Sequence, residues 1–184
     1  VDFFNQHIEA AVQLDCDHMV VSTGFAYLDV DAEDAFGWCA EAMGRIARKA
    51  EQEGVTLAVE PFTKYTTHIC NEASQLRRLL RTVNSPRLMG LADTDVIATT
   101  AVDTFSTFLD VIGPENLGHV HFVDGNPGGH LVPGDGVLDL DGALEKAKAI
   151  HYTGALGLEV LDRRYVFAPE AAMKQAMDWY KERI

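Results

Sequence analysis

Basic residues are scarce in this chain of 184 residues, which carries 15 lysines and arginines against 28 aspartates and glutamates and a net charge of −13. Because binding to a phosphate backbone needs a basic face, this balance argues against a nucleic-acid partner. Long apolar runs are also missing, since none approaches the roughly 20 residues that a membrane span needs, and no signal peptide is visible at the start. We therefore expect neither a nucleic-acid partner nor a membrane partner.

Cysteine is rare as well, with Cys16, Cys39 and Cys70 as the three examples. Their odd number and their spacing argue against a disulfide framework or a zinc knot, and they favour a reducing, cytoplasmic setting. The first predicted strand is not followed by a Gly-x-Gly-x-x-Gly motif, so a dinucleotide-binding sheet is poorly supported. A hydrophobic content of 47% is nevertheless enough for one globular domain with a real core.

The chain does contain an alternation of short apolar runs and amphipathic segments. Strands are predicted at 18–22, 55–60, 88–93, 119–122 and 156–160. Helices are predicted at 2–14, from an Asp31 cap to Gly54, from an Asn71 cap to Val83, and at 99–112, 139–150 and 169–180. The helix at 99–112 is expected to bury Val102. Because nearly continuous apolar strands that alternate with amphipathic helices are typical of parallel strands covered by helices, the predicted fold class is α/β.

Polar residues fall at or near the carboxyl ends of the last four predicted strands, namely Glu60, Asp93, His121 and Glu159. They are separated by 33, 28 and 38 residues, whereas a (β/α)8 TIM barrel of about 250 residues averages about 31 residues per unit. Five strands account for about five βα units of such a barrel. We therefore expect residues 1–184 to form a single domain, the C-terminal portion of a TIM barrel whose N-terminal strands are missing.

Each of these four residues has a simpler interpretation. Glu60 could be a solvated strand end, Asp93 a turn cap, His121 a rim histidine, and Glu159 the partner of the arginines that follow it. The coincidence of all four at strand ends favours a metal site instead. Three carboxylates and one imidazole suit Mn²⁺ or Mg²⁺, with Co²⁺ also possible, better than a structural zinc.

Five motifs occur in a fixed order, namely AVEPF at 58–62, LADTD at 91–95, GHVHFVD at 118–124, PGDG at 133–136 and GLEVL at 157–161. With these motifs, from about residue 10 to its end, the chain resembles the xylose-isomerase-like TIM-barrel family of sugar isomerases and epimerases. Within that family it is most similar to the ketose 3-epimerases, the group of tagatose/psicose and fructoselysine 3-epimerases.

The resemblance implies an isomerase that acts on a small-molecule sugar. Glu60, Asp93, His121 and Glu159 would be the metal ligands, and Mn²⁺ the favoured ion. The reaction would be deprotonation and reprotonation of a ketose through a metal-stabilised enediolate, with Glu60 and Glu159 as the catalytic groups on its two faces. The family also implies a homodimer or homotetramer.

Three positions depart from the family pattern. Val96 stands where many members carry a histidine, Thr66 where many carry a carboxylate, and Asn126 near the place of a loop arginine. These departures leave the ligand set intact and concern the identity of the sugar. His130, which precedes the PGDG loop, and His68 are the predicted substrate-binding residues.

Other functions remain open from the sequence. An aldose–ketose isomerase, a hydroxypyruvate isomerase or an inosose dehydratase would use the same scaffold. A non-catalytic sugar-binding module is the alternative from another class of protein. An intact mass of about 30 kDa for the native protein, which extrapolates from a complete barrel, would favour the enzyme.

Overall fold

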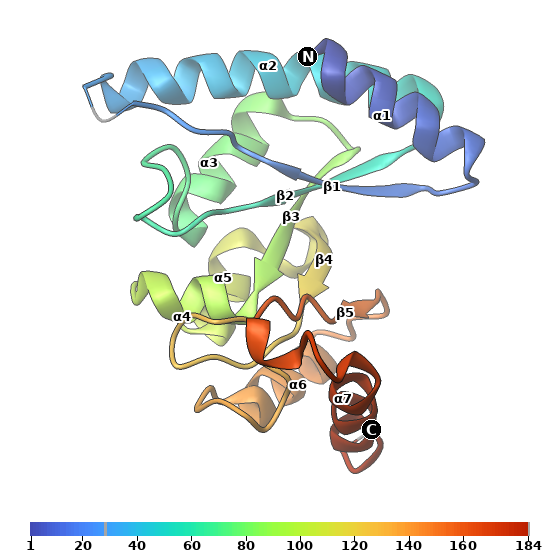
Figure 1. The fold of residues 1–184 in the computed structure, drawn as a ribbon. Helices are drawn as coiled ribbons and strands as arrows, with labels where there is room; N and C mark the ends of the chain where they lie inside the picture. The colour runs from blue at the N-terminus through green and yellow to red at the C-terminus, as the bar shows by residue number, and fades with distance from the viewer. Residues whose placement is uncertain (28, 184) are drawn as a thin grey trace.

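The computed structural model describes residues 1–27 and 29–183, and five strands lie within them (Figure 1). Their bounds are β1 His18–Ser22, β2 Thr56–Glu60, β3 Leu88–Asp93, β4 Leu117–His121 and β5 Leu156–Gly157. They form one sheet in the order β1-β2-β3-β4-β5, and every neighbouring pair is parallel. Sequential order in a parallel sheet is the arrangement of a (β/α)8 barrel, so the predicted class is confirmed.

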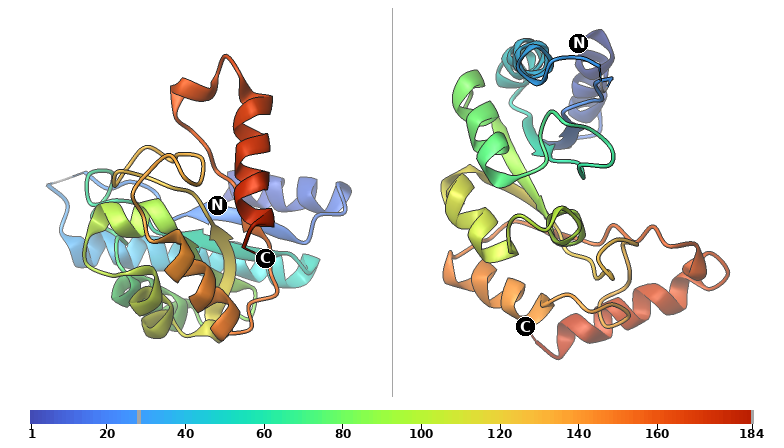
Figure 2. Two further views of the ribbon diagram at one scale, coloured as in Figure 1. Left: turned by 90° about the horizontal axis from the view of Figure 1, so that it is seen from below. Right: turned by 90° about the vertical axis from the view of Figure 1, so that its left-hand side faces the viewer.

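The helices form a C-shaped outer layer around the strands (Figure 2). Their bounds are α1 Asp2–Gln13, α2 Ala32–Glu53, α3 Ala73–Val83, α4 Thr94–Thr100, α5 Phe105–Ile112, α6 Leu140–Ala149 and α7 Pro169–Lys181. Two short 3-10 helices, η1 Pro114–Asn116 and η2 Arg163–Tyr165, complete the elements. Helices that are successive along this layer contact one another, from α2 to α3, α5 and α6. Among the described residues, no helix is both long and apolar enough to cross a membrane.

The core lies between the sheet and this helical layer. All residues of β2 are buried, which explains its continuous apolar run. On α2 the buried stripe contains Phe36, Cys39, Met43 and Ile46, as the three- and four-residue spacing predicts. Burial of a large apolar side chain such as Met43 or Ile46 contributes about 1.5–3 kcal/mol to folding. This packing fixes the strands whose ends carry the polar residues.

The ends of α2 follow the predicted capping chemistry. The carboxylate of Asp31 accepts hydrogen bonds from the backbone N–H groups of Glu33 and Asp34, at 2.8 and 3.3 Å. Gly54 closes the helix with a left-handed φ of 76°. Both termini are therefore set by residues that are recognisable in the sequence.

Asn71 does not cap a helix, contrary to the prediction. Its side-chain amide donates to the carbonyl oxygens of Phe62 and Thr67, both at 2.8 Å, and α3 begins at Ala73. The Ala73 N–H at the start of α3 instead donates to Asp103 Oδ2 at 3.1 Å. The side chain of Asn71 thus braces the loop after β2.

The single helix predicted at 99–112 is also wrong. Ala101 has a left-handed φ of 58° and divides the region into α4 and α5. Asp93 caps the first of these helices and Thr104 caps the second, so each has its own start signal. As a result Val102, expected in the core, is 62% exposed. The strand predicted at 156–160 is likewise shorter, because β5 stops at Gly157.

Candidate metal centre

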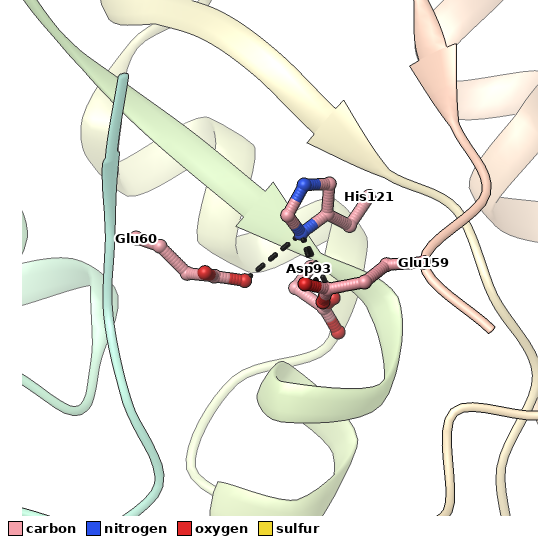
Figure 3. Close-up of side chains that lie close together, drawn as sticks. All are labelled: Glu60, Asp93, His121 and Glu159. Atoms are coloured by element: carbon pink, nitrogen blue, oxygen red, sulfur yellow. Dashed lines mark hydrogen bonds and ion pairs between the residues drawn. The ribbon is translucent and has the colours of Figure 1, made fainter. Parts of the chain in front are cut away.

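The carboxyl ends of neighbouring strands bring the four predicted ligands together (Figure 3). Glu60, Asp93 and His121 are the last residues of β2, β3 and β4. Asp93 and His121 are direct partners in the ladder between β3 and β4. Glu159 follows β5 by two residues and approaches from the other side.

One ligand atom from each of these residues lies within 4.8 Å of the others. His121 is at the middle of the group, since its Nδ1 lies 2.9 Å from Glu60 Oε1, 3.3 Å from Glu159 Oε2 and 3.5 Å from Asp93 Oδ2. Glu60, Asp93 and His121 are buried, and the Glu159 side chain is 36% exposed. The cluster therefore offers three carboxylate oxygens and one imidazole nitrogen to a single small volume.

Asp93 divides its two carboxylate oxygens between two tasks. Oδ1 accepts hydrogen bonds from the backbone N–H groups of Asp95 and Val96, both at 2.8 Å, and so caps α4. Oδ2 is fully buried and accepts no hydrogen bond, although His121 Nδ1 and His130 Nε2 lie 3.5 and 3.4 Å away. Since buried polar atoms are nearly always paired, the free oxygen fits a group that binds between the carboxylates. The set of hard oxygen donors fits a divalent cation there.

The pKa shifts of the cluster also favour a positively charged group among the carboxylates. Burial raises the pKa of Glu60, whereas hydrogen bonds from His121 and His130 lower the pKa of Glu159 to about 2. Burial opposes the charged form of His121, but its close contacts with the carboxylates of Asp93, Glu159 and Glu60 outweigh burial and raise its pKa to about 11. The carboxylates thus require positive charge, which protonated imidazole supplies when no cation is bound.

His130, a predicted substrate-binding residue, reaches the same cluster from the long loop after β4. Its Nε2 lies 3.4 Å from Asp93 Oδ2 and 3.3 Å from Glu159 Oε2, and its Nδ1 lies 3.0 Å from Asp95 Oδ2. Burial opposes its charged form, yet the close contacts with these carboxylates raise its pKa to about 12. The structure thus brings five of the six predicted site residues together.

His68 stands apart from that group. Both of its ring nitrogens are buried and lack a hydrogen-bond partner. The structure gives it no polar contact with the four predicted ligands, so its role stays a prediction. The predicted alternative, in which Glu159 pairs with Arg163 or Arg164, is wrong among the residues that the structure describes, because the ion pairs of Glu159 are with His121 and His130. Arg164 pairs with Asp162 at 3.1 Å instead.

Sequence reasoning missed Asp95, which is 1% exposed and contacts His130 directly. It lies inside the LADTD motif, two residues after a predicted ligand. The available signal was a second carboxylate in the first turn of a helix at the rim of the sheet. Its partners lie about one βα unit later in the chain, and no local pattern marks them.

Two curated relatives are epimerases. The chain is 26% identical over 183 residues to fructoselysine 3-epimerase from Shigella flexneri. This match covers 98% of this chain and 65% of that protein. It is 30% identical over 118 residues to ketose 3-epimerase from Arthrobacter globiformis. This match covers 64% of this chain and 39% of that protein. The chain thus spans less than two thirds of the length of these relatives.

Solved structures share the fold. D-psicose 3-epimerase from Clostridium cellulolyticum H10, solved with D-tagatose, has a TM-score of 0.84 at 18% identity, covering 99% of this chain and 69% of that one. The 3-keto-D-glucoside 4-epimerase of E. coli has a TM-score of 0.83 at 18% identity, covering 97% and 69%. The IolI protein, solved with a zinc atom, has a TM-score of 0.81 at 19% identity, covering 96% and 66%.

These likenesses show the fold, a partial (β/α)8 barrel. A family model described as "Xylose isomerase-like TIM barrel" matches residues 1–183, and the chain therefore belongs to that family.

Proposed function

We propose that this chain carries the metal centre of a divalent-metal-dependent sugar epimerase, a ketose 3-epimerase. The observation that carries the proposal is the convergence of Glu60, Asp93, His121 and Glu159, with a buried Asp93 oxygen among them that accepts no hydrogen bond. The names of the curated relatives, fructoselysine 3-epimerase and ketose 3-epimerase, support the reaction class. Mn²⁺ is the favoured ion, with Mg²⁺ or Co²⁺ as alternatives, because hard oxygen donors predominate.

Held by these four ligands, a divalent cation would withdraw electron density from a ketose carbonyl and so acidify the neighbouring C–H bond. The protein's own contribution is to place bases on both faces of the sugar. Figure 3 shows Glu60 and Glu159 approaching His121 from opposite sides. The two carboxylates come from β2 and from the segment after β5, which are separated by β3 and β4.

Epimerisation follows from that placement. One glutamate accepts the proton from the sugar carbon, and the other donates a proton to the opposite face of the same carbon. The configuration of the substrate decides which glutamate acts first, and no electron is gained or lost overall. His130 would contact a substrate hydroxyl through Nε2, which already faces the carboxylates. His68 is the second proposed substrate contact.

The first experiment uses the native protein that contains this chain, with the Glu159→Gln variant beside the wild type. Mn²⁺ binding is measured by calorimetry, and deuterium incorporation from D₂O is followed across a panel of ketoses. Tight Mn²⁺ binding that the substitution weakens at least about 100-fold, with deuterium entering C3, is the expected result. Exchange confined to another carbon would instead assign an aldose–ketose isomerase.

A matched control is Glu145→Gln, which removes an exposed glutamate paired with Lys148 at 3.1 Å. It should bind Mn²⁺ like the wild type. Unchanged Mn²⁺ binding in Glu159→Gln, or absence of exchange with every ketose, would overturn the epimerase and favour the sugar-binding module.

The homodimer or homotetramer, the cytoplasmic setting and the barrel strands expected before Val1 stay predictions. Intact mass and light scattering of the native protein test the chain length and the oligomer.

A further inference from the structure

Asp95 is buried, and the hydrogen-bond and ion-pair partners of its carboxylate lie in the loop after β4. Its Oδ1 accepts a hydrogen bond from the Gly128 N–H at 2.6 Å. Its Oδ2 accepts one from the His130 N–H at 3.1 Å and lies 3.0 Å from His130 Nδ1. His130 is the basic side chain that pairs with Asp95, and no lysine or arginine does so within residues 1–27 and 29–183. Because a buried carboxylate is costly unless it is paired, this pairing defines what Asp95 does.

The backbone of the loop is shaped to this carboxylate. A Cβ on Gly125 would lie 1.9 Å from Asp95 Oδ1, so a side chain at that position would displace the acid. His130 itself has a left-handed φ of 47°, a conformation that a residue with a side chain adopts only when its surroundings impose it. Asp95 contributes to that constraint, because it binds both the backbone and the ring of His130.

The orientation of the His130 ring follows from these contacts. With Nδ1 directed to Asp95, Nε2 is the ring nitrogen left to face Asp93 and Glu159, at 3.4 and 3.3 Å. We propose that Asp95 is a positioning residue, which fixes the ring of His130 so that Nε2 meets an oxygen of the sugar bound at the metal centre. This inference rests on the proposed function, since it assigns how one of the substrate contacts is held.

A second buried carboxylate separates this role from simple anchoring of the loop. Asp124 accepts hydrogen bonds from the N–H groups of Gly125, Gly134, Gly136 and Leu138, at 2.8, 3.0, 3.0 and 3.0 Å. It stabilises the same loop, and His130 is not among its partners. Asp124→Asn is therefore a matched control for Asp95→Asn.

The test uses the native protein that contains this chain, as wild type, Asp95→Asn, His130→Gln, the double variant and Asp124→Asn. Asp95→Asn should lower kcat about 10- to 100-fold, the range typical of residues that orient a metal-site group. Mn²⁺ affinity, measured by calorimetry, should change less than about threefold because no ligand is removed. The double variant should be no slower than His130→Gln alone, since both substitutions remove one interaction.

A structural readout stands beside the kinetics. In the metal-free wild type, the Nδ1 proton of His130 should give a protected NMR signal, and Asp95→Asn should abolish it while Asp124→Asn leaves it in place. Absence of the signal in the wild type would overturn the proposal without any variant having to fold. So would equal kcat values for Asp95→Asn and the wild type, or effects of the two single substitutions that multiply.

Failure of the two proposals can be told apart. If the wild type neither binds Mn²⁺ nor exchanges deuterium into a ketose, the proposed function fails, whatever the NMR signal shows. If the wild type does both and the His130 signal does not depend on Asp95, the positioning role alone fails.

Discussion

The two sides of the candidate metal centre are built in different ways. Glu60, Asp93 and His121 end three consecutive strands, and all three are buried. Glu159 and His130 lie on irregular segments, where their side chains are 36% and 18% exposed. Regular strand pairing therefore positions one side, which we term the strand side, and hydrogen bonds between loops position the other, the loop side.

The loop side is held by a few contacts between the segments that follow β4 and β5. The Leu161 N–H donates to the carbonyl oxygen of His130 at 3.1 Å. The Tyr165 hydroxyl donates to Asp135 Oδ2 at 2.7 Å and accepts from the Val132 N–H at 3.2 Å. Since loops open more readily than paired strands, the two sides should differ in their response to substitution.

Loss of a ligand from the strand side should have the largest effect. Asp93→Asn removes the free Oδ2 charge but keeps an oxygen that can cap α4 through Asp95 and Val96. Mn²⁺ affinity, measured by calorimetry, should fall at least about 100-fold, while the free energy of unfolding of the metal-free protein should fall by no more than about 1 kcal/mol. The remote cap variant Asp31→Asn should leave Mn²⁺ binding unchanged. Equal Mn²⁺ affinity in both variants would remove Asp93 from the ligand set.

Next to the strand side, Thr94→Val should cause the largest loss of stability, because Thr94 directly follows Asp93 and joins the end of β3 to the segment after β4. The buried Thr94 hydroxyl donates to the Val123 carbonyl at 2.6 Å and accepts from the Val123 N–H at 2.9 Å. An isosteric valine leaves both backbone groups unpaired, so the free energy of unfolding should fall by about 2 kcal/mol. Urea denaturation measures it, with Thr82→Val as an exposed control that should lose less than about 0.5 kcal/mol. Similar losses in the two variants would contradict this assignment.

Loosening of the loop side should cost less. Tyr165→Phe removes the hydroxyl that joins Asp135 to the Val132 N–H, and about 1 kcal/mol of stability should be lost with it. Mn²⁺ affinity should fall only a few-fold, because Glu159 remains present but is held less firmly. A larger loss of stability than in Thr94→Val, measured in the same urea series, would reverse the order of the two sides.

The last prediction concerns cysteine labelling of the unaltered protein, which changes neither side of the metal centre. Burial raises the pKa of Cys39 to about 11 and also raises the pKa of Cys70, which lies in the loop after β2. Cys16 is exposed. In the folded protein a thiol reagent should modify the two buried residues at least about 100-fold more slowly than Cys16, as mapped by mass spectrometry. Fast labelling of Cys70 would show that the loop after β2, whose Phe62 N–H donates to the Cys70 carbonyl at 3.1 Å, opens readily, and this would weaken the contrast between the two sides.

The strand side was predictable because its signals are local. An apolar run followed by a single polar residue marks Glu60 and Asp93. On the loop side, Glu159 was predicted from the barrel period and not from a local signal. The break between α4 and α5 was missed, because apolar spacing continues through Ala101 although its backbone turns left-handed. The pairing of Asp95 with His130 was missed because its partners are 33 and 35 residues away, joined only by the folded loop.

The divided carboxylate of Asp93 has a consequence for the dynamics of α4. One oxygen accepts from the amides of Asp95 and Val96, and the other faces the metal centre. A cation that draws this side chain toward the centre acts on the acceptor of both amides, so the first turn of α4 and the occupancy of the centre are coupled. Amide hydrogen exchange at these two positions should therefore report metal binding in the absence of any sugar.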